Sequence, residues 1–314
     1  MEKKLYSVVI PLYNEEEVVQ ECILRVLRVM EAVDGDYEII FVNDGSSDAT
    51  SALVREACGK NHRIRLIDFS RNFGHQTAIT AGMDHAAGDA VIVMDADLQD
   101  PPETIPLMIE KFLEGYDVVY AVRTKREGET FFKKLTARLF YRFLKAMCSI
   151  DIPVDTGDFR LLGRRVVNVM KNLTERNRYV RGLVAWVGFN QAKVEYTREK
   201  RFAGKTKYPL RKMLQLSVDG ITSFSTKPLK LSINIGIFMA FAGFLYAVYV
   251  VIMRLAGSTM QTGWASTVVL ILVVGGIQLI MLGIIGEYIA RIFDESKNRP
   301  LYIIKDKVNM GDNT

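Results

Sequence analysis

Residues 90–97 read Ala-Val-Ile-Val-Met-Asp-Ala-Asp, an apolar run of five residues followed by two aspartates one residue apart. An apolar run of this length is consistent with a strand that is buried on both faces of a parallel sheet. Asp95 and Asp97 would then leave the sheet together at the carboxyl end of the strand, where ligands bind in such sheets. A divalent cation and a phosphate could meet there, and a solvated loop is the alternative interpretation.

Four further short runs read as strands, at residues 7–10, 38–42, 64–67 and 117–120. Between the first two, apolar residues recur at helical spacing: Val18, Val19, Cys22, Ile23, Val26, Leu27 and Met30. This order of a strand, an amphipathic helix and a second strand predicts an α/β fold with a mainly parallel sheet. Asn14, Glu15, Asn43 and Asp44 would then follow strands at the same edge as Asp95.

Two uncharged apolar segments lie near the carboxyl end, at residues 233–253 and 264–286. Their lengths match a hydrocarbon core of roughly 30 Å, so they predict a transmembrane hairpin. Arg254 is the one basic residue of the short connection, whereas basic residues flank the hairpin on its other side: Lys227, Lys230, Arg291, Lys297, Arg299, Lys305 and Lys307. By the positive-inside rule we expect a multi-pass protein of the cell (inner or plasma) membrane with both termini cytoplasmic.

Residues 131–148 place large apolar side chains at four-residue steps, with lysines and arginines on much of the remaining circumference. This pattern is typical of a helix that lies in a membrane interface, and a core-packing helix is the alternative. A weaker pattern at about 208–227 suggests a second interfacial element. We therefore expect a cytoplasmic domain over residues 1–230, the hairpin over 231–290 and a cytoplasmic tail over 291–314.

The charge of the chain is unevenly distributed. Residues 1–120 carry 10 Lys and Arg against 22 Asp and Glu, whereas residues 121–230 carry 25 against 9. An acidic first part suits a cation-dependent site, and a basic middle part suits anionic lipids or an anionic substrate. The basic part contains no recognised nucleic-acid motif and directly precedes the apolar segments, so we expect membrane lipids and no nucleic acid as partners. Three widely spaced cysteines suggest neither a disulfide framework nor a zinc site.

Three motifs follow one another at strand ends: SVVIPLYNE at 7–15, VNDGSSD at 42–48 and MDADLQDPPE at 94–103. With these motifs the chain resembles glycosyltransferase family 2. DTGDFRL at 155–161, RFAGKTKY at 201–208 and the two apolar segments resemble its polyprenyl-phosphate branch, which contains the bactoprenol glucosyltransferases and the dolichol-phosphate mannose synthases. The resemblance covers about residues 5–295, and it implies a Rossmann-like domain of the GT-A type.

The resemblance also assigns donor-binding residues. Pro11, Tyr13 and Glu15 correspond to the place where the family seats the base and ribose, and Asp44 resembles the aspartate that binds the nucleotide. Asp95 would contact ribose or metal. From the residues alone, Tyr13 could instead be buried against the sheet, and Asp44 could be a turn or N-cap residue ahead of residues 46–47.

A metal site is expected at the third motif. Departure of a nucleoside diphosphate develops negative charge, which a bound Mg²⁺ or Mn²⁺ stabilises. Asp97 is the best ligand candidate, Asp95 lies beside it, and the resemblance adds the carbonyl of Gln99. We therefore predict that Asp97 is essential to catalysis.

The acceptor side of the reaction leaves an alternative open. Asp158 resembles the position assigned as catalytic base in this family, yet a lipid monophosphate has a second pKa of ~6 and needs no base at neutral pH. Asp158 could instead orient an arginine. The alternative for each basic residue is that it belongs to a solvated, charged surface. Four of them are candidates for binding the acceptor phosphate: Arg123, Arg138, Arg201 and Lys207.

Together these patterns predict metal-dependent, inverting transfer of one hexose from a nucleotide sugar to undecaprenyl or a similar polyprenyl phosphate at the cytoplasmic membrane face. UDP-glucose and UDP-N-acetylglucosamine are the favoured donors. A GDP-mannose-dependent synthase is the first alternative, and a non-catalytic membrane adaptor is the second. Glycines of the apolar segments would permit helix contacts within one protomer or in a homo-oligomer, and they do not choose between the two.

Overall fold

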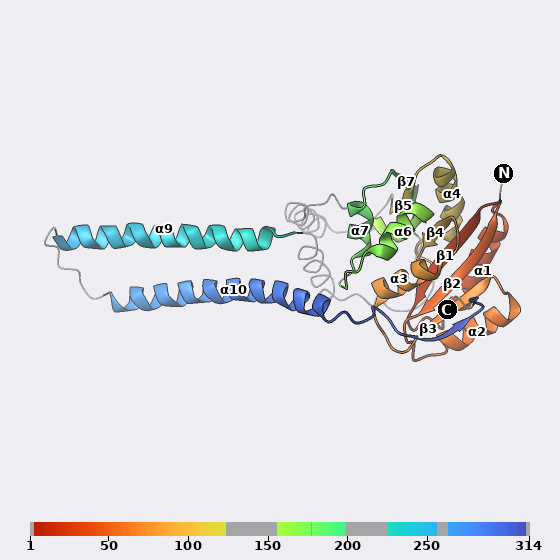
Figure 1. The fold of residues 1–314 in the computed structure, drawn as a ribbon, viewed down its shortest axis with the longest axis horizontal. Helices are drawn as coiled ribbons and strands as arrows, with labels where there is room; N and C mark the ends of the chain where they lie inside the picture. Colours follow the sequence, from red (N-terminus) through yellow and green to blue (C-terminus); the bar gives the residue numbers. More distant parts are fainter. Residues whose placement is uncertain (1–2, 124–155, 177, 199–224, 256–262, 312–314) are drawn as a thin grey trace.

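The computed structural model describes residues 3–123, 156–176, 178–198, 225–255 and 263–311. The predicted interfacial helix at 131–148 and nearly all of the second element at 208–227 lie outside the described residues. The described residues form an α/β domain and two long helices that extend away from it (Figure 1).

One mixed sheet organises the α/β domain. Its strand order within the described residues is β7-β5-β6-β4-β1-β2-β3-β8. The strands are β1 (Leu5–Leu12), β2 (Asp36–Asn43), β3 (Ile64–Phe69), β4 (Ala90–Val93), β5 (Val118–Arg123), β6 (Thr156–Gly163), β7 (Gln191–Tyr196) and β8 (Ile304–Val308). β4, β1, β2 and β3 are parallel neighbours, and β5 is parallel to β7, which confirms the predicted mainly parallel sheet. β6 and β8 are antiparallel to their neighbours.

Helices cover both faces of the sheet. Packed with one face are α1 (Val19–Glu31), α2 (Thr50–Lys60), the short 3-10 helix η1 (Pro102–Thr104) and α4 (Ile105–Leu113). Packed with the other are α3 (His75–His85), α6 (Arg164–Asn172) and α7 (Val180–Trp186). Alternate residues of β1 serve the two cores: Val8 and Ile10 face the first, and Val9 faces the second. The central strands are therefore apolar throughout because both of their faces are buried.

The predicted crossover helix is α1. Its buried side chains include Val19, Cys22, Ile23, Val26 and Met30, which recur every three or four residues and face the sheet. The helix returns the chain to the start of β2, so β1 and β2 run parallel. Sequence periodicity alone was sufficient to place this element.

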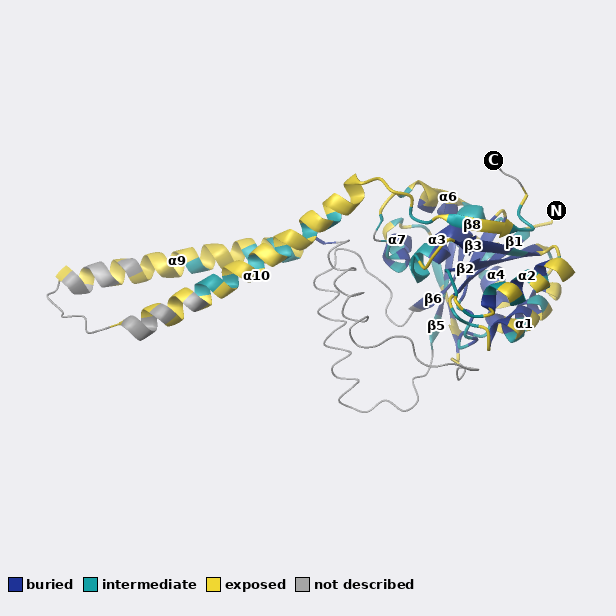
Figure 2. Cartoon of the chain, turned by 90° about the horizontal axis from the view of Figure 1, so that it is seen from below, coloured by how far each residue is buried: buried dark blue, intermediate teal, exposed yellow. Residues whose placement is uncertain are grey.

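The hairpin consists of α9 (Lys227–Leu255) and α10 (Trp264–Ser296), which contain the two predicted spans. Their described large apolar side chains are mostly exposed, as with Phe238 at 68%. Figure 2 shows this contrast between the buried sheet and the exposed hairpin. Both helices are long and apolar enough to cross a membrane. Helices that are apolar all round need an apolar surrounding, because water disfavours such surfaces.

The chain returns to the α/β domain after α10. Residues 304–308 form β8, which pairs antiparallel with β3 at the edge of the sheet. The ring of Tyr302 stacks on Phe69 with 5.3 Å between centroids, and its hydroxyl donates a hydrogen bond to Asp84 in α3 at 3.0 Å. Sequence analysis assigned no element to this segment. Its short pattern of alternating charge carries little signal without the partner strand.

Candidate active site

Three strand ends meet at one edge of the sheet. β1 lies between β2 and β4 and is parallel to both, so the chain leaves all three strands at the same side. Pro11 is buried within β1 opposite Val42. Tyr13 follows the strand and is 43% exposed, so the structure contradicts the alternative in which its ring is buried against the sheet. Its ring therefore lies partly exposed at this edge of the sheet.

The loops after β1 and β2 are tied together by hydrogen bonds. The backbone nitrogen of Asn14 donates to Ser46 Oγ at 2.9 Å, and Asn14 Oδ1 accepts from the nitrogen of Ser47 at 2.8 Å. The nitrogen of Glu15 donates to Thr50 Oγ1 at 2.8 Å. Asn14 has a φ of 53°, a conformation that asparagine tolerates better than most residues. These bonds hold Tyr13 and Glu15 next to the Asp44 loop.

Asp44 organises the loop ahead of α3. Its carboxylate accepts hydrogen bonds from the backbone nitrogens of Phe73 at 2.6 Å and Gly74 at 2.9 Å. These two bonds go to the loop after β3 and not to residues 46–47, where the alternative placed them. Burial raises the pKa of Asp44 against the opposing effect of these two bonds. Asp44 thus joins the ends of β2 and β3 where a nucleotide is expected.

The two aspartates after β4 have different surroundings. Asp95 Oδ1 is buried and has no hydrogen-bond partner. Asp97 Oδ1 accepts from the nitrogen of Gln99 at 3.1 Å, and the intervening Leu98 is buried with a φ of 57°. A bulky residue rarely adopts this conformation, and such local strain clusters at functional sites. Gln99 Oε1 accepts a hydrogen bond from Arg198.

Asp158 lies at the start of β6, beside the end of β4. β6 runs antiparallel to β4 with Val93 opposite Arg160, so Asp158 extends beyond Val93 toward Asp95. His75, the first residue of α3, lies between the two carboxylates, with Nε2 3.4 Å from Asp95 Oδ1 and 3.3 Å from Asp158 Oδ2. Sequence reasoning missed His75, because no short motif links it to residues that follow 20 and 83 positions later.

The charged groups of this cluster shift one another's pKa values. Burial would raise the pKa of Asp158, but Arg181, His75 and Arg160 hold it well below its usual range. Burial lowers the pKa of His75, yet Asp95 and Asp158 together raise it to about 9. Burial raises the pKa of Asp95 to about 6 against the charge of His75, and Asp158 adds to the rise. Perturbed titrating groups gathered at strand ends are typical of an active site.

Arg123 is the described member of the four predicted acceptor cations. It ends β5, and its Nε donates to the hydroxyl of Tyr196 at 3.0 Å. The same hydroxyl donates to Asp100, whose carboxylate lies 3.6 Å from Arg123 Nη2. A Cβ at Gly157 would come within 2.9 Å of Arg123 Nη2, so a larger residue there would displace the guanidinium. Arg138, Arg201 and Lys207 lie outside the described residues.

The expected metal fits the residues at the end of β4. The buried Asp95 Oδ1 accepts no hydrogen bond within the described residues, and a carboxylate oxygen of this kind is a ligand that a hard cation can use. Within the described ranges no three His, Cys, Asp or Glu side chains are grouped so that they could hold a metal alone. Mg²⁺ is commonly bound by one or two carboxylates together with substrate phosphates, and Asp95 with Asp97 would provide such a pair.

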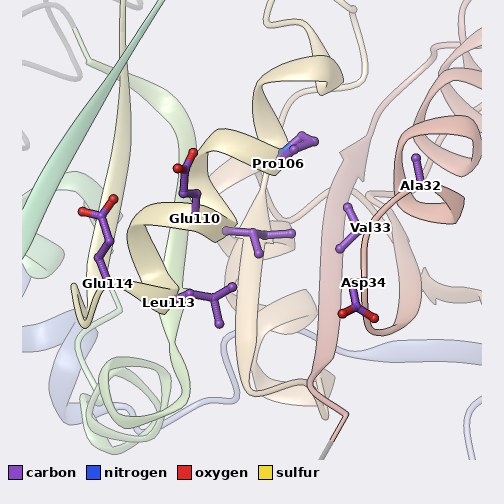
Figure 3. A pocket seen from close by; sticks show the side chains of 8 residues that line it. Ala32, Val33, Asp34, Pro106, Glu110, Leu113 and Glu114 are labelled. Atoms are coloured by element: carbon purple, nitrogen blue, oxygen red, sulfur yellow. The ribbon is translucent and has the colours of Figure 1, made fainter. Parts of the chain in front are cut away.

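A separate groove of about 490 Å³ runs between the end of α1 and α4. Figure 3 shows its mixed lining of apolar and acidic side chains: Ala32, Val33, Asp34, Pro106, Ile109, Glu110, Leu113 and Glu114. None of the predicted site residues lines it. The candidate active site is therefore the cluster at the strand ends and not this groove.

Comparisons with known proteins classify the chain. Residues 7–170 match Glycosyl transferase family 2, and residues 227–292 match the GtrB C-terminal hairpin. The uncharacterized glycosyltransferase YkcC of Bacillus subtilis (strain 168) is 59% identical over 96% of this chain and 93% of its own length. The bactoprenol glucosyl transferase of Shigella phage SfV is 43% identical over 96% of this chain and 98% of its own.

Among solved structures, a similar chain is glucosyl-3-phosphoglycerate synthase from Mycobacterium tuberculosis in complex with Mn²⁺, UDP-glucose and phosphoglyceric acid. It is 22% identical, with a TM-score of 0.45 over 70% of this chain and 78% of that chain. The family match and the long relatives are sufficient to classify the protein. The chain belongs to glycosyltransferase family 2, and it is a glycosyltransferase of the GT-A fold with a GtrB-type hairpin at its carboxyl end.

Proposed function

We propose that the protein transfers one hexose from a nucleotide sugar to a polyprenyl phosphate, with inversion at the anomeric carbon. The observation that carries this proposal is the pair Asp95 and Asp97 at the end of β4, with a buried Asp95 oxygen that accepts no hydrogen bond and lies 3.4 Å from His75 Nε2. Relatives named bactoprenol glucosyl transferase, matched over nearly their full length, support the polyprenyl acceptor and make UDP-glucose the first donor to test. UDP-N-acetylglucosamine is the second.

The chemistry follows from the groups at the strand ends. Asp95 and Asp97 would hold Mg²⁺ or Mn²⁺, and the ion when bound would neutralise charge that develops on the departing diphosphate. Tyr13, Glu15 and Asp44 would seat the nucleoside. An oxygen of the lipid phosphate forms a bond to the anomeric carbon while the bond from that carbon to the diphosphate breaks, and the electron pair leaves with the nucleoside diphosphate. Attack from the face opposite the leaving group accounts for inversion.

The hairpin would anchor this reaction at the membrane. β1 and β8 belong to one sheet, which supports the placement of the α/β domain and both ends of the hairpin on one side of the bilayer. Basic residues flanking α9 and α10 favour the cytoplasmic side. A site confined near the headgroups meets a lipid-bound acceptor at a raised effective concentration.

Asp97→Ala tests the metal assignment. We expect transfer from UDP-glucose to undecaprenyl phosphate to fall at least about a hundredfold, because the leaving diphosphate loses its main charge partner. EDTA should abolish wild-type transfer, and added Mg²⁺ or Mn²⁺ should restore it. Asp34→Ala, in the groove between α1 and α4, is the matched control and should keep full activity. Undiminished turnover by the Asp97 variant would contradict the assignment.

A GDP-mannose-dependent transferase is the rival within the same family. Incubation of the purified protein with radiolabelled donors, followed by extraction of the glycolipid, distinguishes the two. The nucleotide that raises the melting temperature most gives an independent answer, since ligands stabilise the state that binds them. A protein that transfers no sugar from any donor would favour the non-catalytic alternative.

A further inference from the structure

The carboxylate of Asp158 is fully occupied by donors from the protein. Oδ1 accepts from Arg181 Nε at 3.0 Å and from Arg160 Nη2 at 3.4 Å. Oδ2 lies 3.3 Å from His75 Nε2 and accepts from Gln76 Nε2 at 3.2 Å and from Arg181 Nη2 at 3.4 Å. An ionised carboxylate has about four lone-pair positions. A substrate proton would therefore have to displace one of these donors before Asp158 could accept it.

The acceptor of the proposed reaction does not require a base. The second pKa of a phosphate monoester is ~6, so its attacking oxygen is already mostly deprotonated at neutral pH. What the dianion requires is a cation that offsets its repulsion from the carboxylates and the donor diphosphate. The acceptor phosphate therefore requires a cation near Asp158 that can still donate hydrogen bonds.

Arg181, on α7, is held in a way that leaves it available. Its Nε and Nη2 bind the two oxygens of Asp158 in a fork, which fixes the plane of the guanidinium. Nη1 makes no hydrogen bond to any described part of the chain, and the side chain is 30% exposed. Arg160 is only 5% exposed and donates to the carbonyl of Gly157, so it is committed to the protein.

Arg181 also lies near the expected transfer centre. Asp158 bridges it to His75, and His75 lies 3.4 Å from Asp95 Oδ1. An anion bound at Nη1 would therefore share this cluster of charges. Arg123 is the less exposed of the two arginines, at 22% against 30%, and Tyr196 and Asp100 engage its Nε and Nη2.

We propose that Arg181 binds the phosphate of the lipid acceptor and that Asp158 is a positioning residue that acts through Arg181 and not as the base. The inference rests on the proposed function and adds a phosphate-binding residue to it. No proton moves in the step: the phosphate oxygen bonds to the anomeric carbon, and the bond to the diphosphate breaks. Arg160, His75 and Gln76 keep Asp158 in place while it holds the guanidinium.

The test uses the full chain in detergent micelles with UDP-[¹⁴C]glucose, Mg²⁺ and undecaprenyl phosphate. Arg181→Ala should raise the KM for undecaprenyl phosphate about ten- to a hundredfold, the range for one charged hydrogen bond, while the KM for UDP-glucose stays within about twofold. Arg181→Lys should recover part of the loss. Arg165→Ala, on α6 with a side chain 78% exposed, is the matched control and should match the wild type.

A double-mutant cycle decides the role of Asp158. If Asp158 acts through Arg181, then Asp158→Ala combined with Arg181→Ala should transfer no more than about threefold slower than Arg181→Ala alone. If Asp158 were the base, the rate loss of the double variant would equal the product of the two single losses, and that result would overturn the proposal. An unchanged acceptor KM in Arg181→Ala, with a normal UDP-induced rise in melting temperature, also overturns it. If the wild type fails to glucosylate the lipid, the proposed function fails first, so the two failures are distinguishable.

Discussion

At the scale of single residues, the two described cysteines show how burial controls reactivity. Cys22 in α1 and Cys58 in α2 are both fully buried. Burial raises the pKa of Cys22 to about 12 and that of Cys58 to about 11. Alkylating reagents react with the thiolate, so both side chains should be inert in the folded protein. Neither is suited to a redox or nucleophilic role.

This inertness can be measured in a Cys148→Ser variant. Iodoacetamide at pH 8 should leave Cys22 and Cys58 unlabelled in the folded protein and should label both in SDS, with mass spectrometry as the readout. The same burial makes stability fall as pH rises above about 8.5, because unfolded thiols then release protons that the folded state retains. Rapid labelling of either cysteine without denaturant would show that its surroundings open readily.

Asp44 can both support the structure and contact the nucleotide. Its two backbone partners, Phe73 and Gly74, come from the loop that precedes α3, so the carboxylate joins loops from β2 and β3. A carboxylate already bound to two amides is well placed and well oriented before any ligand arrives. Structural support and nucleotide contact are therefore compatible roles for Asp44.

At the scale of elements, β8 ties the end of the hairpin to the donor side of the site. Tyr302, just before β8, stacks on Phe69, and Phe69 makes an edge-to-face contact with Phe73 at 5.6 Å. Phe73 in turn donates its backbone N–H to Asp44. Arg55 adds an ion pair from α2 to Asp306 at 2.6 Å. A strand added after the hairpin thus supports the loop that holds Asp44.

Tyr302 should accordingly affect stability and donor binding together. We expect Tyr302→Ala to reduce the free energy of unfolding by about 2 to 4 kcal/mol through lost aromatic packing, and to weaken UDP binding. Tyr302→Phe keeps the ring stack and loses the hydrogen bond to Asp84, so we expect the free energy of unfolding to fall by about 1 kcal/mol. Thermal unfolding in detergent, with and without UDP, provides both measurements. The exposed Lys305→Ala is the control, and equal behaviour of all three variants would exclude this role for Tyr302.

At the scale of the whole molecule, the hairpin interrupts the α/β domain in sequence but not in space. The sheet receives β8 only after the chain has passed through α9 and α10. A chain that ends at residue 226 would therefore leave the outer edge of β3 unpaired, and an unpaired edge strand promotes aggregation. The α/β domain includes residues near both ends of the described chain.

Two soluble versions of the protein test this architecture. One ends at residue 226, and the other replaces residues 227–298 with a flexible Gly/Ser linker of about 20 residues, long enough to span about 25 Å. We expect the linked version to be monodisperse by size-exclusion chromatography and to melt at a higher temperature than the truncated one. Identical melting temperatures would show that β8 contributes nothing to the sheet.

Much of the fold could be predicted because its signals are local. The apolar runs of β1 to β5 and the spacing of α1 depend on neighbouring residues, and so do the lengths of α9 and α10. The paired aspartates Asp95 and Asp97 were likewise identifiable from one short motif at the end of an apolar run. For these features, periodicity and burial follow directly from the residue types.

The remaining features depend on long-range contacts. His75 reaches Asp158 across 83 positions, and Arg55 reaches Asp306 across 251. Arg181 is a candidate for phosphate binding only because α7 places it beside Asp158. Predicting such pairs requires the order of the strands in the sheet, and the spacing of residues along the chain does not reveal that order. The sequence by itself therefore determined five of the eight described strands, the two long apolar segments and the metal-type motif, whereas only the tertiary structure decided which charges surround Asp158 and how β6, β7 and β8 complete the sheet.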